Sequence, residues 1–263
     1  MITSLNDFFD QVLRASATLR DAAVATLFPS ACRVCGETIE SWRDGVACSA
    51  CWLEIEREDA DFRPKCPKCW ATLDAPASVD TGAGRRCLCE SFAFDFVRSC
   101  GPYRGAMRET VLLLKRTPHL PARLRGALRR AFAALPDSSL IESIIPMPLY
   151  PERLAERGFN QAEVIARELA RLAGLRVDST AVIRVKKTER HRAGMGSRER
   201  ARSLEKAFRV RAPRLVEGRV ALLVDDVMTT GSTAGEVARA LLDSGARSVN
   251  VLTLARAMNE FGV

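Results

Sequence analysis

The sequence has 263 residues, of which 47% are hydrophobic and 27% are charged, so its composition excludes a chain that is disordered throughout. No apolar stretch is long enough to predict a transmembrane helix, and Asp7 and Asp10 stand where a signal peptide needs a basic and then an apolar segment. We therefore expect a cytoplasmic protein without membrane insertion. The formal net charge of +8 favours anionic partners such as phosphorylated metabolites, nucleic acid or an acidic protein; a generally basic surface is the alternative.

Residues 1–29 are predicted to hold one amphipathic helix. Apolar side chains recur at helical spacing between about Ser4 and Phe28, and Pro29 ends the helix. Its polar face carries acids as well as arginines, which favours packing against protein over binding to a membrane surface.

Residues 30–91 are rich in cysteine and poor in periodic apolar residues, so this segment cannot build a conventional core. Eight of the 9 cysteines form close pairs, a spacing typical of metal sites: Cys32, Cys35, Cys48, Cys51, Cys66, Cys69, Cys87 and Cys89. The first four predict a tetrahedral, structural zinc site with four thiolate ligands. The last four predict a second site, in which one pair has the tighter C-x-C spacing and Trp70 replaces the usual glycine. We expect a double zinc ribbon; sequential pairing is favoured, although the spacing also fits interleaved pairing. The ninth cysteine, Cys100, is predicted to be a buried thiol.

Residues 92–263 alternate strand-like and helix-like patterns, which predicts an α/β domain with a Rossmann-like parallel sheet. Strands are expected near residues 92–96, 141–147, 177–185, 220–225 and 249–255. Helices are expected near residues 105–115, 122–135, 160–173 and 233–244. Asn160 is the predicted N-cap of the third helix and Gly174 its C-terminal stop, while Gly245 ends the last helix.

The strongest chemical signal lies where the apolar residues 221–224 run into two adjacent acids, Asp225 and Asp226. A hydroxyl-rich turn follows and leads into a helix; its residues are Val227, Met228, Thr229, Thr230, Gly231, Ser232 and Thr233. At the carboxyl end of a parallel strand, such a turn offers free main-chain N–H groups and a helix N-terminus to a phosphate. Two carboxylates would repel that phosphate, but they suit the hydroxyl groups of a neighbouring diol. The segment therefore predicts a site for a ribose 5-phosphate; acids that merely cap a helix are the alternative.

This segment resembles the 5-phosphoribosyl 1-pyrophosphate (PRPP) motif of type I phosphoribosyltransferases. Further stretches resemble the ComF family of competence-associated proteins: Tyr103-Arg104-Gly105 with Leu114-Lys115, Pro146-Met147-Pro148 with Arg157-Gly158-Phe159-Asn160-Gln161, and Leu254-Ala255-Arg256. With the cysteine pairs, the resemblance covers nearly the whole chain after about residue 28. It implies a type I phosphoribosyltransferase fold in which Asp225 and Asp226 bind the ribose hydroxyls and residues 228–233 surround the 5-phosphate. It also implies Mg2+ bound with PRPP, and a role in the uptake or use of external DNA.

A PRPP site also needs donors for the pyrophosphate group. The stretch from Pro146 to Gly158 is in the corresponding place, and Arg153, Arg157 and Gly158 are its candidate ligands. An exposed helix face followed by a turn is the alternative interpretation.

The basic run 184–202 stands where the family has a mobile loop that closes over PRPP, which makes Lys187 and Arg190 further candidates. The match is incomplete, because His191 and Ser203 stand where the family pattern usually has Gln and Asn. A solvated loop and a nucleic-acid-binding surface are the other interpretations of this run.

Two functions are compatible with these features. The first is an enzyme that transfers the phosphoribosyl group of PRPP to an unidentified acceptor with Mg2+, and no catalytic residue is assigned for it. The second is a non-catalytic protein that senses PRPP or another ribose 5-phosphate, or that binds single-stranded DNA or DNA-uptake proteins. The sequence predicts neither the acceptor nor the oligomeric state.

Overall fold

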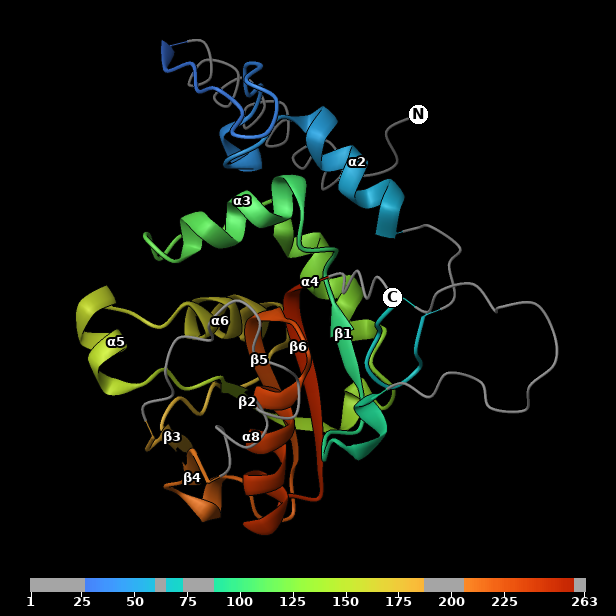
Figure 1. The fold of residues 1–263 in the computed structure, drawn as a ribbon, viewed down its shortest axis with the longest axis vertical. Coiled ribbons are helices and arrows are strands. Elements are labelled where there is room, and N and C mark those ends of the chain that lie inside the picture. Colours follow the sequence, from blue (N-terminus) through green and yellow to red (C-terminus); the bar gives the residue numbers. More distant parts are fainter. Residues whose placement is uncertain (1–26, 60–64, 73–87, 187–205, 258–263) are drawn as a thin grey trace, which may run out of the picture.

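The protein is described from a computed structural model that covers residues 27–59, 65–72, 88–186 and 206–257. Its centre is a four-stranded parallel sheet with the strand order β1-β6-β5-β2 (Figure 1). The strands are β1 (Val97–Ser99), β2 (Ile141–Pro146), β5 (Val220–Met228) and β6 (Ser248–Arg256). The central strands β5 and β6 are buried along most of their length because helices cover both faces of the sheet. The predicted α/β fold with a parallel sheet is confirmed.

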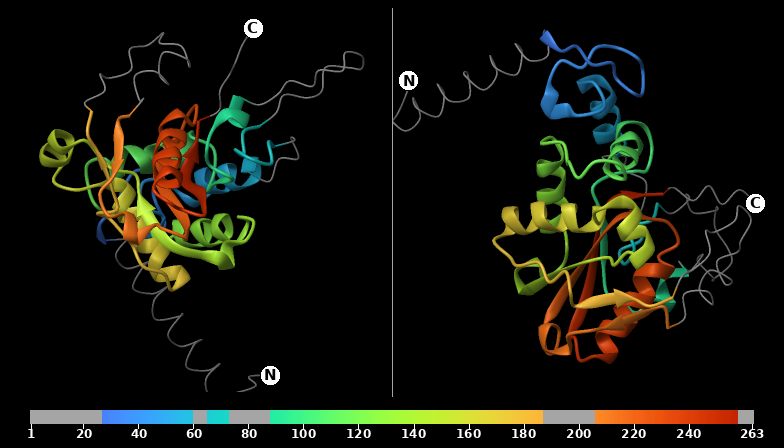
Figure 2. Two further views of the ribbon diagram at one scale, coloured as in Figure 1. Left: turned by 90° about the horizontal axis from the view of Figure 1, so that it is seen from below. Right: turned by 90° about the vertical axis from the view of Figure 1, so that its left-hand side faces the viewer.

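Four helices cover this sheet, three on one face and one on the other. They are α3 (Gly105–Leu114), α4 (Leu124–Ala133), α6 (Gln161–Ala173) and, on the opposite face, α8 (Ser232–Asp243). Alternate residues of β5 supply the two cores: Leu222 packs on the side of α3, α4 and α6, and Leu223 on the side of α8. Figure 2 shows the same arrangement from two further directions.

Smaller elements surround this framework. Helix α2 (Ser49–Asp59) packs against α3, and α5 (Pro151–Arg157) connects β2 to α6. Short 3-10 helices are η1 (Trp42–Asp44), η2 (Leu88–Ser91), η3 (Ser138–Leu140) and η4 (Pro213–Leu215). The predicted caps of α6 are confirmed, because the Asn160 side chain accepts a hydrogen bond from the Ala162 N–H and Gly174 is left-handed at φ 70°.

The prediction of a parallel strand over residues 177–185 is wrong. Only Val177 forms a bridge with Ile144 of β2, and the chain then leaves the sheet edge at Asp178, whose carboxylate accepts a hydrogen bond from the Ser143 hydroxyl. The rest of the segment contributes β3 (Val182–Arg184), which pairs antiparallel with β4 (Phe208–Val210) in a separate two-stranded sheet.

Two strand boundaries also differ from the predictions. The alternating phenylalanines near residue 92 precede the strand, since β1 begins at Val97; the rings of Phe92 and Phe94 instead lie 5.5 Å apart in the core on the α8 side. Strand β5 continues to Met228, three residues beyond its predicted end, because it stays paired with β6. Both predicted acids therefore lie inside a strand.

The N-terminal helix predicted between about Ser4 and Phe28 lies almost entirely outside the described residues, so it stays a prediction. The division of the chain at residues 29/30 and 91/92 also stays a prediction, and cysteines from residues 30–91 take part in both apolar cores of the α/β domain. Among the helices that the structure describes, none has the length and apolar character needed to cross a membrane.

Candidate functional site

Strand β5 carries the two predicted acids to the carboxyl edge of the sheet, where ligands of open α/β sheets bind. Asp225 is paired in register with Thr253 of β6, and Asp226 is only 8% exposed. Each carboxylate accepts a main-chain hydrogen bond: Asp225 from the Asp226 N–H at 2.8 Å, and Asp226 from the Val227 N–H at 2.7 Å. These bonds hold both carboxylates at the edge of the sheet.

The two acids are held together against their mutual repulsion. Burial raises the pKa of the Asp225 carboxyl well above its ordinary value, and the negative charge of Asp226 raises it further. The Asp226 N–H and the positive charge of Lys115 act in the opposite direction but are weaker. Such a pair is typical of a site whose ligand supplies the missing cation or hydroxyl donors.

The β5–α8 loop (residues 229–231) places hydrogen-bond donors beside these acids. Within the described part of the chain, the main-chain N–H groups of Thr229, Thr230 and Gly231 have no acceptor. The Thr230 hydroxyl lies 2.9 Å from the hydroxyl of Ser232, the first residue of α8. Free N–H groups, hydroxyls and a helix N-terminus together suit an anion such as a phosphate.

Gly231 is required by the geometry of this loop. Its φ of 89° lies in the left-handed region. A Cβ at this position would stand 2.6 Å from the Cε of Met228 and 3.1 Å from the ring of Phe92. Any side chain here would displace the loop or its neighbours.

Basic side chains from three further elements lie around the acids. The Nζ of Lys115, which follows α3, lies 3.9 Å from the Oδ2 of Asp226. Arg184 of β3 lies near both Arg153 of α5 and Asp225: burial and the charge of Arg153 lower the pKa of Arg184, and the charge of Asp225 opposes them. The acids thus lie between positive groups that could hold further negative charge.

Gln161 connects the acids to α5. Its Nε2 donates to the Oδ2 of Asp226 at 3.3 Å, and its Oε1 accepts a hydrogen bond from the Nη1 of Arg157. The preceding residue, Asn160, donates to the Met147 carbonyl at 2.9 Å and so anchors the start of α6 beside the end of β2. Arg157, a predicted pyrophosphate ligand, therefore reaches the acids through one side chain.

The other predicted pyrophosphate ligands have different positions. Arg153 lies on the exposed surface of α5. Gly158 ends that helix in a left-handed conformation, with a φ of 78°, and its N–H donates to the Leu154 carbonyl at 2.8 Å, so that N–H is not free for an anion. Lys187 and Arg190 lie outside the described residues.

Three residues of this constellation were not assigned from the sequence: Lys115, Gln161 and Arg184. The first two stand in motifs that resemble the ComF family, and the third begins the basic run. The local sequence around these three residues does not predict that they lie near the acids. They come close to Asp225 and Asp226 only because α3, α6 and β3 meet the end of β5 in the folded chain.

The four sulfurs of the first cysteine cluster (Cys32, Cys35, Cys48 and Cys51) all lie within 4.8 Å of one another. The Sγ atoms of Cys32 and Cys51 are 3.8 Å apart, and those of Cys35 and Cys48 are 3.6 Å apart. Bonds of about 2.3 Å to a tetrahedral zinc ion place thiolates about 3.8 Å apart, so this donor set fits zinc. Burial acts to raise the pKa of Cys32, but the N–H groups of its neighbours lower it to about 6, whereas burial raises the pKa of Cys51.

The second cysteine cluster (Cys66, Cys69 and Cys89) brings together three of its four predicted members. Their sulfurs lie within 4.8 Å of one another, and those of Cys66 and Cys89 are 3.5 Å apart. Cys87 lies outside the described residues. Each cluster combines cysteines that are consecutive along the chain, as in the sequential pairing favoured by the sequence. Cys100 is a buried thiol in neither cluster.

Both clusters begin with the same kind of hairpin. Residues 31–38 and 65–72 are each closed by one antiparallel bridge. In each hairpin the first cysteine donates its N–H to the carbonyl five residues later: Cys32 at 2.7 Å and Cys66 at 2.8 Å.

The residue after the second cysteine of each hairpin has a left-handed backbone: Gly36 at φ 84° and Trp70 at φ 59°. Trp70 therefore adopts, at a cost in free energy, the conformation for which a glycine is usual. Residues 48–52 and 66–70 share the pattern Cys-x-x-Cys-Trp but not a conformation, since Cys48 directly precedes α2 and Cys51 lies in its first turn.

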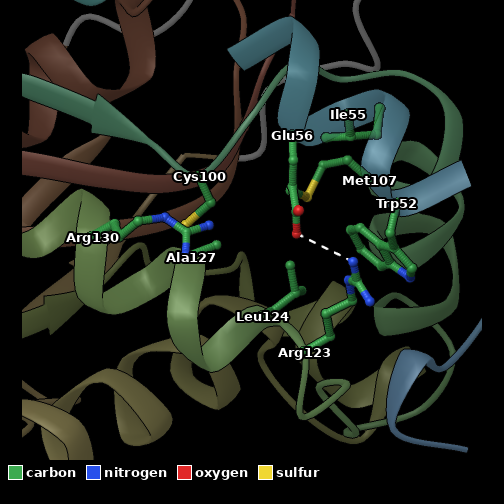
Figure 3. A pocket seen from close by; sticks show the side chains of 9 residues that line it. All are labelled: Trp52, Ile55, Glu56, Cys100, Met107, Arg123, Leu124, Ala127 and Arg130. Carbon is green, nitrogen blue, oxygen red and sulfur yellow. Dashed lines mark hydrogen bonds and ion pairs between the residues drawn. The ribbon is translucent and has the colours of Figure 1, made fainter. Parts of the chain in front are cut away.

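The segment that carries the first cluster meets the α/β domain where α2 faces α3 and α4, an interface that we call the seam. The seam holds a cavity of about 330 Å³ (Figure 3). Arg123 crosses this seam: its guanidinium lies 3.1 Å from Asp44 and 3.4 Å from Glu56, and it faces the ring of Trp52. The cavity is lined by α2, α3, α4 and Cys100, and no residue of the β5–α8 loop contributes to it.

A family model described as "Phosphoribosyl transferase domain" matches residues 154–260, which contain α6, β5, the β5–α8 loop, α8 and β6. The parallel sheet and the acid-and-hydroxyl edge of β5 thus belong to a phosphoribosyltransferase-type domain. A solved structure titled "Structure of the allosteric regulatory enzyme of purine biosynthesis" matches 51% of this chain and 27% of that chain, at 17% identity and a TM-score of 0.32.

Curated relatives narrow the assignment. The chain is 31% identical to DNA utilization protein YhgH of Salmonella typhi over 88% of this chain and 98% of that protein. It is 29% identical to competence protein ComFC of Bacillus subtilis over 81% of this chain and 85% of that protein. Other alignments to proteins named YhgH span about half of those proteins, for example 51%. The chain belongs to the ComF family.

Proposed function

We propose that the protein binds PRPP together with Mg2+ at the carboxyl edge of the sheet and transfers its phosphoribosyl group to an acceptor. One observation supports this proposal most strongly: Asp225 and Asp226 lie at the edge of the sheet next to the β5–α8 loop, whose main-chain N–H groups have no acceptor in the described part of the chain. A phosphate alone would be bound by the loop but repelled by the acids. A ribose 5-phosphate offers a phosphate to the loop and hydroxyl groups to the acids.

In this proposal the ligand lies across the edge of the sheet. Asp225 and Asp226 accept hydrogen bonds from the two ribose hydroxyls, and the N–H groups and hydroxyls of residues 229–233 donate to the 5-phosphate. Lys115 and Arg184 lie near the acids, and Arg157 is linked to them through Gln161, so these three side chains would add positive charge for the pyrophosphate group. Arg153, Lys187 and Arg190 stay proposed ligands of the pyrophosphate group. Gly158 contributes only a turn.

The chemistry requires little beyond position and charge. The bond between C1 of the ribose and the pyrophosphate oxygen breaks, the electron pair leaves with the pyrophosphate, and C1 bonds to the acceptor, whose proton passes to solvent. Mg2+, when bound, supplies charge neutralisation to the pyrophosphate. The protein's own groups hold the sugar and stabilise the departing charge, so no side chain is assigned as an acid or base.

We assign structural zinc to both cysteine clusters. Thiolates in the first cluster fill all four positions of a tetrahedral ion, which leaves no position for catalysis. Cys87 would complete the second cluster. Zinc would stabilise a segment that has few apolar side chains of its own.

The experiment is calorimetric titration of the full chain with PRPP and Mg2+. We expect saturable binding by the wild type and a loss of about 100-fold or more in Asp225→Asn/Asp226→Asn, because neutral amides remove charge that the hydroxyls and metal require. Asp243→Asn at the exposed end of α8 is the matched control. Equal affinity in all three proteins would overturn the proposed site, and release of pyrophosphate with a panel of acceptors then tests turnover.

A second candidate is a non-catalytic role in the uptake or use of DNA, in which the protein senses PRPP or binds single-stranded DNA. The relatives' names and the net charge of +8 favour it. Single-stranded DNA binding that is unchanged by the Asp substitutions, but is lost when Arg190, Arg192 and Arg198 are neutralised, would support this role. Absence of such binding at low salt would exclude direct DNA binding.

A further inference from the structure

We propose that the second cysteine cluster, closed by its metal, holds Phe92 against the β5–α8 loop, so that metal bound in the cluster and ligand bound at the loop stabilise each other. Phe92 is then a positioning residue for the loop. The identity of the ligand rests on the proposed function, whereas the coupling between the cluster and the loop does not.

Both main-chain polar groups of Phe92 are hydrogen-bonded to segments that carry the cluster. Its N–H donates to the Cys89 carbonyl at 3.1 Å. Its carbonyl accepts a hydrogen bond from the Nζ of Lys68 at 2.8 Å, and Lys68 lies in the hairpin between Cys66 and Cys69. The position of Phe92 therefore depends on the two segments that the metal would join.

The ring of Phe92 packs on the first turn of α8. A Cβ added at Gly231 would stand 3.1 Å from this ring, and one added at Gly235 would stand 2.7 Å from it. The Gly235 N–H donates to the Gly231 carbonyl at 2.8 Å, so the ring covers the turn that fixes the end of the loop. Only glycine allows so close an approach, and withdrawal of the ring would leave this turn unsupported.

Arg256 forms a second connection between the cluster and the loop. It ends β6, where it is paired in register with Met228, the residue just before the loop. Its side chain is 9% exposed, and its Nη2 donates to the Sγ of Cys69 at 3.7 Å. A thiolate centre carries excess negative charge, which this buried guanidinium is placed to balance. The strand end that precedes the loop is thus also joined to a predicted metal ligand.

These contacts predict reciprocal coupling. Metal binding would fix the hairpin of residues 65–72 and Cys89 relative to each other. Part of the free energy of metal binding would then stabilise the position of Phe92 and of the loop on which it packs. If the metal orders the loop for its ligand, the ligand must by linkage strengthen metal binding by the same factor. The first cluster belongs to the other apolar core, together with residues of α2 and α3, and none of the contacts described for it involves the loop, so it provides an internal comparison.

The first test needs no ligand. Hydrogen exchange of the full zinc-loaded chain is followed in peptides that cover residues 228–235, for the wild type, Phe92→Ala, Phe92→Leu and the matched control Phe132→Ala on α4. We expect the exchange rate of these peptides to rise about fivefold or more in Phe92→Ala. In Phe92→Leu it should be much closer to the wild-type rate, and in Phe132→Ala it should equal the wild-type rate. Zinc content is measured in the same samples. Wild-type exchange in a zinc-replete Phe92→Ala would overturn the coupling.

The second test uses PRPP with Mg2+ as the probe. Loss of zinc to a chromogenic chelator is timed with and without PRPP. We expect PRPP to slow release of the second zinc about fivefold or more in the wild type, in line with ordinary coupling energies, and clearly less in Phe92→Ala, in which only the connection through Arg256 remains. Equal protection in both proteins would contradict the inference. If the wild type does not bind PRPP in calorimetry, the proposed function fails, and the exchange experiment still decides the coupling.

Discussion

Each of the two cysteine clusters begins with the same kind of hairpin, but the clusters lie in different parts of the molecule. The first is partly open, since Cys35 is exposed, and it rests on a seam with a cavity and a crossing Arg123. The second has all three described cysteines buried, and it is connected to the β5–α8 loop through Phe92 and to the end of β5 through Arg256. The same kind of cysteine hairpin thus lies at a seam in one place and beside the end of β5 in another, and only the tertiary contacts distinguish the two.

Removing one thiol from each cluster tests whether the two clusters differ in function. We expect Cys69→Ser to lower PRPP affinity about fivefold or more, because it releases both Phe92 and Arg256, and Cys35→Ser to change it by less than about threefold. Calorimetry with parallel zinc analysis checks this. Equal losses in the two variants would mean that the clusters do not differ in function.

Two glycines with left-handed backbones, Gly231 and Gly158, test the contact between Phe92 and the loop. Gly231→Ala adds a left-handed alanine and a clash with Met228 and Phe92, which should cost about 2–3 kcal/mol of folding free energy. Gly158 has a similar φ of 78° with nothing within 4 Å of an added Cβ, so Gly158→Ala should cost only about 1 kcal/mol. Urea denaturation measures both. Costs that match would show that the Phe92 contact contributes nothing.

On the side of the first cluster, Arg123→Ala removes the charged contacts across the seam. Because Arg123 and Glu56 are partly exposed, we expect a loss of only about 1 kcal/mol in the free energy of unfolding and no change in PRPP affinity. Thermal unfolding and calorimetry on one preparation test both statements. A large fall in affinity would show that the seam, rather than the second cluster, controls the loop.

The smallest expected effect concerns Asp225. Its folded-state pKa is raised, so the folded protein holds this proton more tightly than the unfolded chain, and stability falls as the pH rises above the unfolded pKa of about 4. Asp225→Asn should therefore raise the Tm by a few degrees at pH 7, and the gain should shrink as the pH approaches 4. A stabilisation independent of pH would show that burial and repulsion of the carboxylate are not its cause.

Much of the fold could be predicted because local patterns determine it. The strand at β5, the caps of α6 and the helix α8 follow from short segments such as Asn160 to Gly174. The segment near residue 180 was assigned to the wrong sheet, because an apolar run does not show which strand it pairs with. The strand near residue 92 was placed too early, because alternating aromatic residues also fit an extended chain that packs its rings beside a helix.

The candidate site divides in the same way. The acids and the hydroxyl-rich turn are adjacent in sequence, so Asp225 to Thr233 could be selected directly. Lys115 and Gln161 could not be linked to Asp226, since they are 111 and 65 residues away in the chain and meet it only at the sheet edge. The support of the loop by Phe92 was likewise invisible, because no local pattern relates a cysteine pair to a glycine more than a hundred residues later.

A crystal soaked with PRPP and Mg2+ would show whether the edge of β5 holds a sugar phosphate. We expect the 5-phosphate about 3 Å from the N–H groups of Thr229, Thr230 and Gly231, with the ribose hydroxyls at Asp225 and Asp226. A fully occupied ligand elsewhere in the molecule, or a loop that stays empty at saturating PRPP, would contradict it.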